Sequence, residues 1–177
     1  NLSLYAITIA VPIIGALGLF VSYQIYQGVL AKNDGTDRMR EIALAIREGA
    51  FSYLSQQFRY LSVLVALVFV IIWFSLDLAT AFAYMLGSAG SLLAGFLGMR
   101  SATISNVRTA YAASQKNQDE ALLVAFEGGA VMGMAVACLV TLGLGLLFLV
   151  FGSPEACEPL VGFGMGASSV ALFARVG

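Results

Sequence analysis

The chain has 177 residues, of which 60% are hydrophobic and 11% are charged, and its formal net charge is -1. Soluble domains usually contain about 25% charged residues, so this chain has too little polar surface to enclose a water-soluble core. The small net charge and the absence of a Lys/Arg run exclude an electrostatic surface for nucleic acid. Histidine is absent, which excludes histidine-based acid–base catalysis and histidine metal ligands. The composition therefore indicates an integral membrane protein.

Five apolar stretches are candidates for helices that cross a bilayer, whose core of about 30 Å requires about 20 residues per helix. Four of them have sufficient length, and the fifth is shorter. We expect a polytopic, all-α transmembrane bundle with helices at about 4–26, 42–76, 78–100, 118–151 and 160–175. Because the chain starts without Met and stops shortly after the fifth stretch, we expect a fragment of a longer protein.

Lys and Arg gather on one side of these predicted spans, whereas the opposite connections carry only acidic residues. The nine basic residues are Lys32, Arg38, Arg40, Arg47, Arg59, Arg100, Arg108, Lys116 and Arg175. Cytoplasmic loops are enriched in Lys and Arg, so we expect the N-terminus to lie outside. The first apolar stretch lacks the features of a signal peptide, and with the short loops this favours a prokaryotic inner membrane.

The second helix is predicted to begin well before its apolar part at 60–76. Residues 39–58 show helical spacing of apolar side chains with charges on the other face. At 1.5 Å per residue, this segment adds about 25 to 30 Å of helix outside the bilayer. The connection 100–120 contains neither Pro nor Gly, so the adjoining helices can extend in the same way. We expect a helical projection on the basic side.

Small residues recur at three- and four-residue spacing in two of the predicted helices, 78–100 and 160–175. Such residues permit close contact between helix backbones in a membrane. We therefore predict that these two helices pack tightly within the bundle.

Glu127 is a carboxylate inside the predicted fourth helix, beside two glycines. A carboxylate in the membrane is a candidate carrier of a proton or another ion. In the competing interpretation, Glu127 marks the cytoplasmic end of a long helix and pairs with Arg108 or Arg100. We favour the second interpretation because the predicted depth of Glu127 is shallow.

Arg175 follows the apolar run 170–174 and has no acidic partner nearby in the sequence. An unpaired guanidinium at this depth is costly. Either its partner lies in sequence beyond this chain and the fifth helix lines a polar pathway, or Arg175 is an anchor that reaches the membrane surface. The sequence alone supports the two interpretations of Arg175 equally. No cluster of carboxylates suits a metal–phosphate site, so we expect no catalytic and no metal-binding residue here.

Several strings occur together in an order and spacing that resemble the membrane-bound, ion-translocating pyrophosphatases. They are Glu48-Gly49-Ala50, Asn106-Val107-Arg108-Thr109, GAVMG at 129–133 and ALFARVG at 171–177. The order and spacing fit from the first predicted helix to the fifth, and the last string is the most specific.

The resemblance implies a sixteen-helix subunit of a homodimer, with residues 1–177 as the N-terminal portion of its transmembrane domain. Such a pump couples hydrolysis of magnesium pyrophosphate on the cytoplasmic side to transport of H+ or Na+, with Mg2+ as cofactor and K+ as a further candidate. The family's transport-linked arginine maps onto Arg175. Its residues that bind magnesium pyrophosphate come later in sequence, so the chain alone is expected to be inactive. Glu127 departs from the small or basic residue expected there.

Two other functions stay open from the residues alone. One is a non-enzymatic transporter or channel subunit, in which Glu127 and Arg175 act as gating charges. The other is a structural membrane subunit that packs through its small residues.

Overall fold

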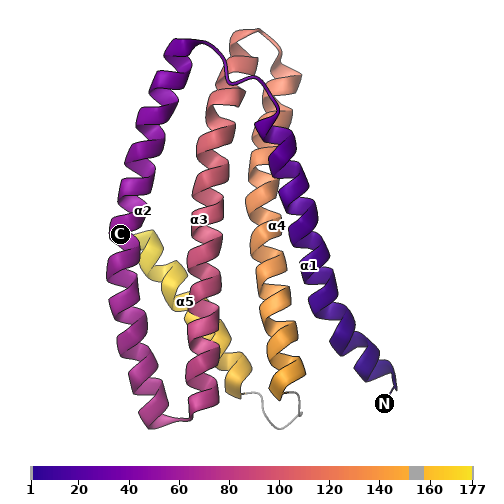
Figure 1. Cartoon of the computed structure of the whole chain (residues 1–177), viewed down its shortest axis with the longest axis vertical. Coiled ribbons are helices and arrows are strands. Elements are labelled where there is room, and N and C mark those ends of the chain that lie inside the picture. The colour runs from indigo at the N-terminus through magenta and orange to yellow at the C-terminus, as the bar shows by residue number, and fades with distance from the viewer. Residues whose placement is uncertain (1, 152–157, 177) are drawn as a thin grey trace.

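The computed structural model describes residues 2–151 and 158–176, without the side chains of residues 2–6, 175 and 176. Within these residues the chain forms five α-helices and no strand, so the predicted all-α bundle is confirmed (Figure 1). The helices are α1 (Leu2–Leu30), α2 (Asp37–Ser75), α3 (Leu78–Ser114), α4 (Gln118–Phe151) and α5 (Glu158–Val176). The first four are long and apolar enough to cross a membrane, and α5 is a shorter apolar helix.

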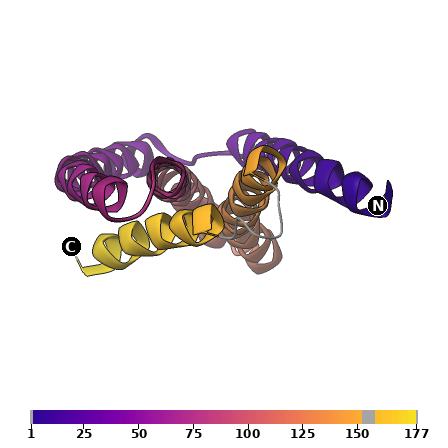
Figure 2. The same cartoon turned by 90° about the horizontal axis from the view of Figure 1, so that it is seen from below.

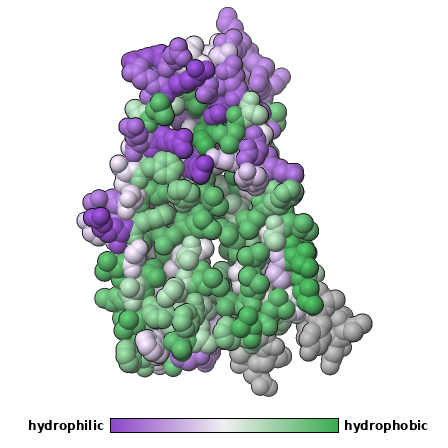
Figure 3. Space-filling model, in the orientation of Figure 1, coloured by the Kyte–Doolittle hydropathy of each residue, from purple (hydrophilic) through white to green (hydrophobic). Residues whose placement is uncertain are grey.

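The helices on the basic side are longer than the sequence predicted. α1 continues to Leu30, α2 begins at Asp37, and α3 continues to Ser114, beyond its predicted end at residue 100. At 1.5 Å per residue, the 39 residues of α2 span about 58 Å, nearly twice the hydrophobic core of a bilayer. The predicted helical projection is therefore present. On the face shown in Figure 3, hydrophilic residues gather at that end of the bundle and hydrophobic residues cover most of the rest.

Polar side chains set where these helices begin. Thr36 and Asp77 are the N-cap residues of α2 and α3, and their side chains accept hydrogen bonds from the backbone N–H groups of Met39 and Thr80. Asn117 accepts in the same way from the backbone of Glu120, at the start of α4. The first N–H groups of a helix have no partner within it, so each cap supplies one. The connections can therefore be short.

α3 is the central helix of the bundle. It packs against α2, α4 and α5, whereas the main contact of α1 is with α4. α5 crosses α3 obliquely in the half of the bundle away from the polar end, and its C-terminal end reaches the side of α2 (Figures 1 and 2). The core around α3 consists largely of small buried side chains, among them Ala81, Ala83 and Ser88. This arrangement brings the backbones of α3 and α5 close together.

The predicted tight packing through small residues is confirmed where α3 meets α5. A Cβ on Gly166 would collide with the carbonyl oxygen of Tyr84, and one on Gly87 would collide with the carbonyl of Phe163. Gly90 and Gly164 have open space around them within the described part of the chain. Only some of the small residues therefore form the contact.

We expect Gly166→Ala to destabilise the protein, with Gly164→Ala as the matched control on the same helix. A backbone carbonyl cannot give way as a flexible side chain does, so the cost should be about 1–3 kcal/mol, as for other overpacked sites. The control should change stability by no more than about 0.5 kcal/mol. Thermal unfolding of both variants in detergent tests this. Equal losses of stability would contradict the close contact between α3 and α5.

Candidate functional site

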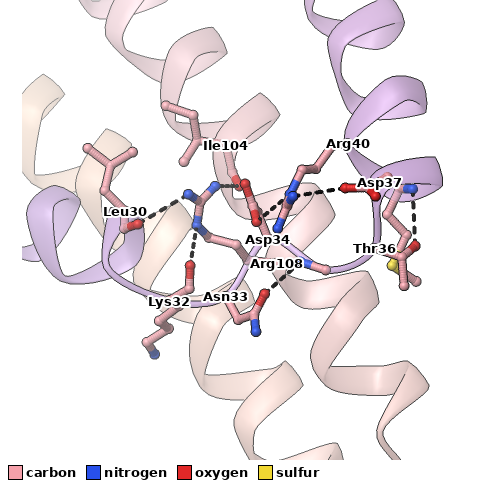
Figure 4. Close-up of polar contacts among 11 residues, drawn as sticks. Leu30, Lys32, Asn33, Asp34, Thr36, Asp37, Arg40, Ile104 and Arg108 are labelled. Atoms are coloured by element: carbon pink, nitrogen blue, oxygen red, sulfur yellow. Dashed lines mark hydrogen bonds and ion pairs between the residues drawn. The ribbon is translucent and has the colours of Figure 1, made fainter.

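The polar end of the bundle is organised by Arg108 of α3, which closes the C-terminal end of α1. Its guanidinium donates hydrogen bonds to the backbone carbonyls of Leu30 and Lys32, each 3.1 Å long, and to that of Ile104 at 2.9 Å (Figure 4). The last carbonyls of a helix lack partners within the helix, and a cation is favourable at that end. Arg108 therefore fixes where the α1–α2 connection leaves the bundle.

The rest of this connection is a solvated polar turn. Arg40 donates to the carboxylates of Asp34 and Asp37 at 2.9 and 3.1 Å (Figure 4). The hydrogen bond from Arg40 holds the pKa of Asp34 below its usual range, so this carboxylate is ionised at neutral pH. These side chains are exposed, and exposed ion pairs contribute little stability. The turn is thus a structural element and offers no enclosed binding site.

Glu127 forms an ion pair with Lys32, and the expected pairing with Arg108 or Arg100 was wrong. The Lys32 Nζ atom lies 2.7 Å from Glu127 Oε2, and the two side chains are only 23% and 29% exposed. Among the described residues, Glu127 Oε2 accepts no hydrogen bond, so the contact with Lys32 is electrostatic. The alternative partners are engaged elsewhere, because Arg108 binds carbonyls and Arg100 donates to the Tyr26 hydroxyl at 2.9 Å.

The position of Glu127 agrees with a shallow location. It lies in the first third of α4, toward the polar end of the bundle, and its partner belongs to the α1–α2 connection. A paired carboxylate near a polar surface is less costly than an unpaired one at mid-membrane. Whether Glu127 takes part in ion transport stays a prediction.

Arg175 lies in the last turn of α5, and its side chain is outside the described residues. The preceding residue, Ala174, accepts a hydrogen bond of 2.8 Å from the side-chain amide of Gln57. Gln57 stands one turn before Tyr60, where the apolar part of α2 begins. The backbone of Arg175 therefore lies at the border between the polar and apolar zones, beside the middle of α2 (Figure 1).

Two apolar cavities flank this end of α5. The larger, of about 720 Å³, lies among α2, α3, α4 and α5, and the smaller, of about 520 Å³, lies between α2 and α5. No charged side chain of the described residues lines either cavity. Their few polar groups include the amide of Gln57, which borders both. Within this part of the chain, neither cavity offers the carboxylates that a cation would require.

The described residues also contain no group of three or more Cys, Asp or Glu side chains placed to hold a metal ion. Binding of a divalent cation with a phosphate compound requires several oxygen ligands around the metal. The residues of this part of the chain therefore do not fit such a site.

Comparison with known proteins extends over almost the whole chain. Residues 16–177 match the family described as inorganic H+ pyrophosphatase. The chain is 41% identical, over 92% of its length, to a putative K+-stimulated pyrophosphate-energized sodium pump of Clostridium tetani. It is 39% identical, over 94% of its length, to a K+-insensitive pyrophosphate-energized proton pump of Methanosarcina mazei. The chain spans only 24% of the length of each relative.

We expect Arg108→Ala to lower the free energy of unfolding by about 2 kcal/mol, because hydrogen bonds from a charged group contribute about 1.5–3 kcal/mol. Arg108→Lys should recover only part of this, since one ammonium group cannot reproduce the planar guanidinium. Arg38→Ala is the control, because Arg38 and its partner Glu41 are 75% and 69% exposed. Denaturant unfolding in detergent compares the three variants. A loss for Arg108→Ala no larger than for Arg38→Ala would contradict the capping role.

A double-mutant cycle with Lys32→Met and Glu127→Gln should give a coupling energy of about 1 kcal/mol, the upper end for partly exposed pairs. The same cycle on Arg38 and Glu41 should give about 0.3 kcal/mol, as is usual for exposed pairs within one helix. Both cycles use equilibrium unfolding in detergent. Zero coupling between Lys32 and Glu127 would show that the ion pair does not form in solution.

Proposed function

The chain belongs to the inorganic H+ pyrophosphatase family, and on this basis we propose that it forms about the first quarter of a pyrophosphate-energised ion pump. The observation that carries the proposal is the family match over residues 16–177, in a chain with four helices able to cross a membrane. The whole protein would hydrolyse pyrophosphate at the cytoplasmic side and use the free energy to move H+ or Na+ across the bilayer.

Magnesium would be bound by sequence beyond this chain, because the described residues offer no acidic cluster for it. When bound, Mg2+ would neutralise and polarise the phosphate oxygens. The 177-residue chain alone should therefore not hydrolyse pyrophosphate. K+ is a further candidate cofactor, since one relative is named as K+-stimulated and another as K+-insensitive.

The similarity of this chain to its relatives does not identify the transported ion. The sodium pump and the proton pump are 41% and 39% identical to the chain, so this region has diverged almost equally from both. Residues that distinguish H+ from Na+ would then lie in the other three quarters of the protein.

The polar, basic end of the bundle would face the cytoplasm, which places the N-terminus outside. The relatives from Clostridium tetani and Methanosarcina mazei are prokaryotic proteins, in support of a prokaryotic inner membrane. By the resemblance of its sequence motifs, the whole protein would be a homodimer of sixteen-helix subunits.

Arg175 is the residue of this chain that we assign to ion transport. Its backbone position at the border of the apolar zone would let a fixed positive charge face acidic residues on helices that follow in sequence. Glu127 would instead be an anchor at the cytoplasmic end of α4, because its charge is balanced by Lys32.

The test is ion transport by inverted vesicles that carry the whole protein, with Mg2+ and pyrophosphate. We expect pyrophosphate hydrolysis together with acidification or Na+ uptake in the wild type. Arg175→Ala removes the fixed positive charge and should lose about tenfold in ions moved per pyrophosphate hydrolysed, which corresponds to about 1.4 kcal/mol. Arg38→Ala, on the same side but exposed, should keep the wild-type ratio.

Two results would contradict different parts of this proposal. No hydrolysis by the wild type would refute the pump and favour a non-enzymatic transporter, a channel subunit or a structural subunit. Normal coupling in Arg175→Ala would keep the pump and remove Arg175 from its ion pathway.

A further inference from the structure

The two halves of α5 are held in different ways. The N-terminal half lies directly on α3, where Gly162 and Gly166 leave no room for a Cβ next to the backbone of α3. Tyr84 of α3 is only 1% exposed, and its hydroxyl lies 3.1 Å from the hydroxyl of Ser169. Close backbone packing and a partly buried polar contact therefore fix α5 from its N-terminal half as far as Ser169.

The C-terminal half of α5 leaves α3 and approaches α2 (Figures 1 and 2). Residues 171–174 are exposed, and Leu172 and Phe173 are 60% and 47% accessible. The two apolar cavities border this half, and beyond the buried Val170 few side-chain contacts restrain it. Apolar contacts are also not directional. Packing within this part of the chain therefore does not fix how the last turn of α5 is rotated.

One directional contact does restrain that turn. The amide of Gln57 donates to the carbonyl oxygen of Ala174 at 2.8 Å, and among the described residues this is the only hydrogen bond between α2 and α5. A carbonyl oxygen has two lone pairs, so it can accept this bond whether or not the helix continues after residue 177. The restrained carbonyl belongs to the residue directly before Arg175.

We propose that Gln57 is a positioning residue that holds the end of α5 against α2 and so sets the place of Arg175. The proposal rests on the transport role proposed above for Arg175. Ala174 and Arg175 are successive residues of the same helical turn, so a shift of that turn away from α2 would move the arginine with it. The last turn of α5 can be held against α2 or released from it. A hydrogen bond usually contributes about 1 kcal/mol, which changes the ratio of these two conformations about fivefold.

The experiment compares three variants of the whole protein in inverted vesicles. Gln57→Met keeps an unbranched side chain of similar length but has no donor, whereas Gln57→His places an N–H at the same number of bonds from the backbone. Gln56→Met is the control, because Gln56 borders the smaller cavity but makes no hydrogen bond to a described residue. For each variant, pyrophosphate hydrolysis and ion transport are measured at a pH of about 8, where a histidine is neutral.

We expect Gln57→Met to move up to about fivefold fewer ions per pyrophosphate hydrolysed, with hydrolysis retained, because a fivefold lower ratio of held to released conformations lowers the held fraction by at most that factor. Gln57→His and Gln56→Met should stay within about twofold of the wild type, a change too small for a lost hydrogen bond. An unchanged ratio in Gln57→Met would overturn the proposal. Equal losses in the Met and His variants would also overturn it, because side-chain shape rather than the donor would then matter.

If Gln57→Met assembles poorly, a distance measurement that does not depend on activity still tests the proposal. Spin labels at positions 60 and 173, on either side of the smaller cavity, report the separation of α2 and α5. The distance distribution should broaden in Gln57→Met and stay as in the wild type in Gln56→Met. Identical distributions would overturn the proposal. If the wild type hydrolyses no pyrophosphate, the proposed function fails, whereas a failure confined to the Gln57 variants removes only this inference.

Discussion

The backbone contact between α3 and α5 is the constraint from which the arrangement of this chain follows. Inside a bilayer, apolar side chains gain little by leaving lipid for one another, so close helix packing depends on small residues. Gly87, Gly162 and Gly166 allow such contact here. Because the contact occupies only the first half of α5, the helix lies obliquely and its second half is carried away from α3 to the side of α2. The position of Arg175 and the two cavities beside α5 both follow from this crossing.

The polar end of the bundle obeys a different constraint, which is the supply of partners for helix ends. Arg108 binds the carbonyl of Leu30, the last residue of α1, and that of Lys32, and this holds the α1–α2 connection against α3. Lys32 belongs to that connection and is thereby placed next to Glu127 of α4. The carboxylate is therefore balanced by a residue from a loop and not by the arginines of the neighbouring helix. Arg108 of α3 thus holds the end of α1 and, through the placement of Lys32, the partly buried Glu127 of α4.

The sequence revealed the features that depend on composition and periodicity, and missed those that depend on how distant segments meet. Hydropathy predicted the five helices, and the glycines of α3 and α5 correctly indicated close packing. The absence of Pro and Gly from 100–120 indicated that α3 could extend beyond residue 100, but its end at Ser114 was not predicted because no apolar stretch marks it. The pairing of Glu127 was assigned wrongly because the capping of α1 by Arg108 leaves no pattern in the sequence. Gln57 belongs to a string, Gln57-Phe58, that matches the family resemblance, but its contact with α5 was not predicted, since a glutamine in an exposed helix normally faces water.

The border location of Arg175 bears on how a pump of this kind could work. A guanidinium in the centre of a bilayer is costly, whereas near the polar zone it can exchange contacts with water, lipid head groups and acidic side chains. A small displacement at this depth therefore changes its partners at modest cost. Within the described residues, α5 is fixed at one end by backbone packing and restrained at the other mainly by one hydrogen bond. If Arg175 carries the transport charge as proposed, movement can be confined to the last turns of α5 while the rest of the bundle remains in place.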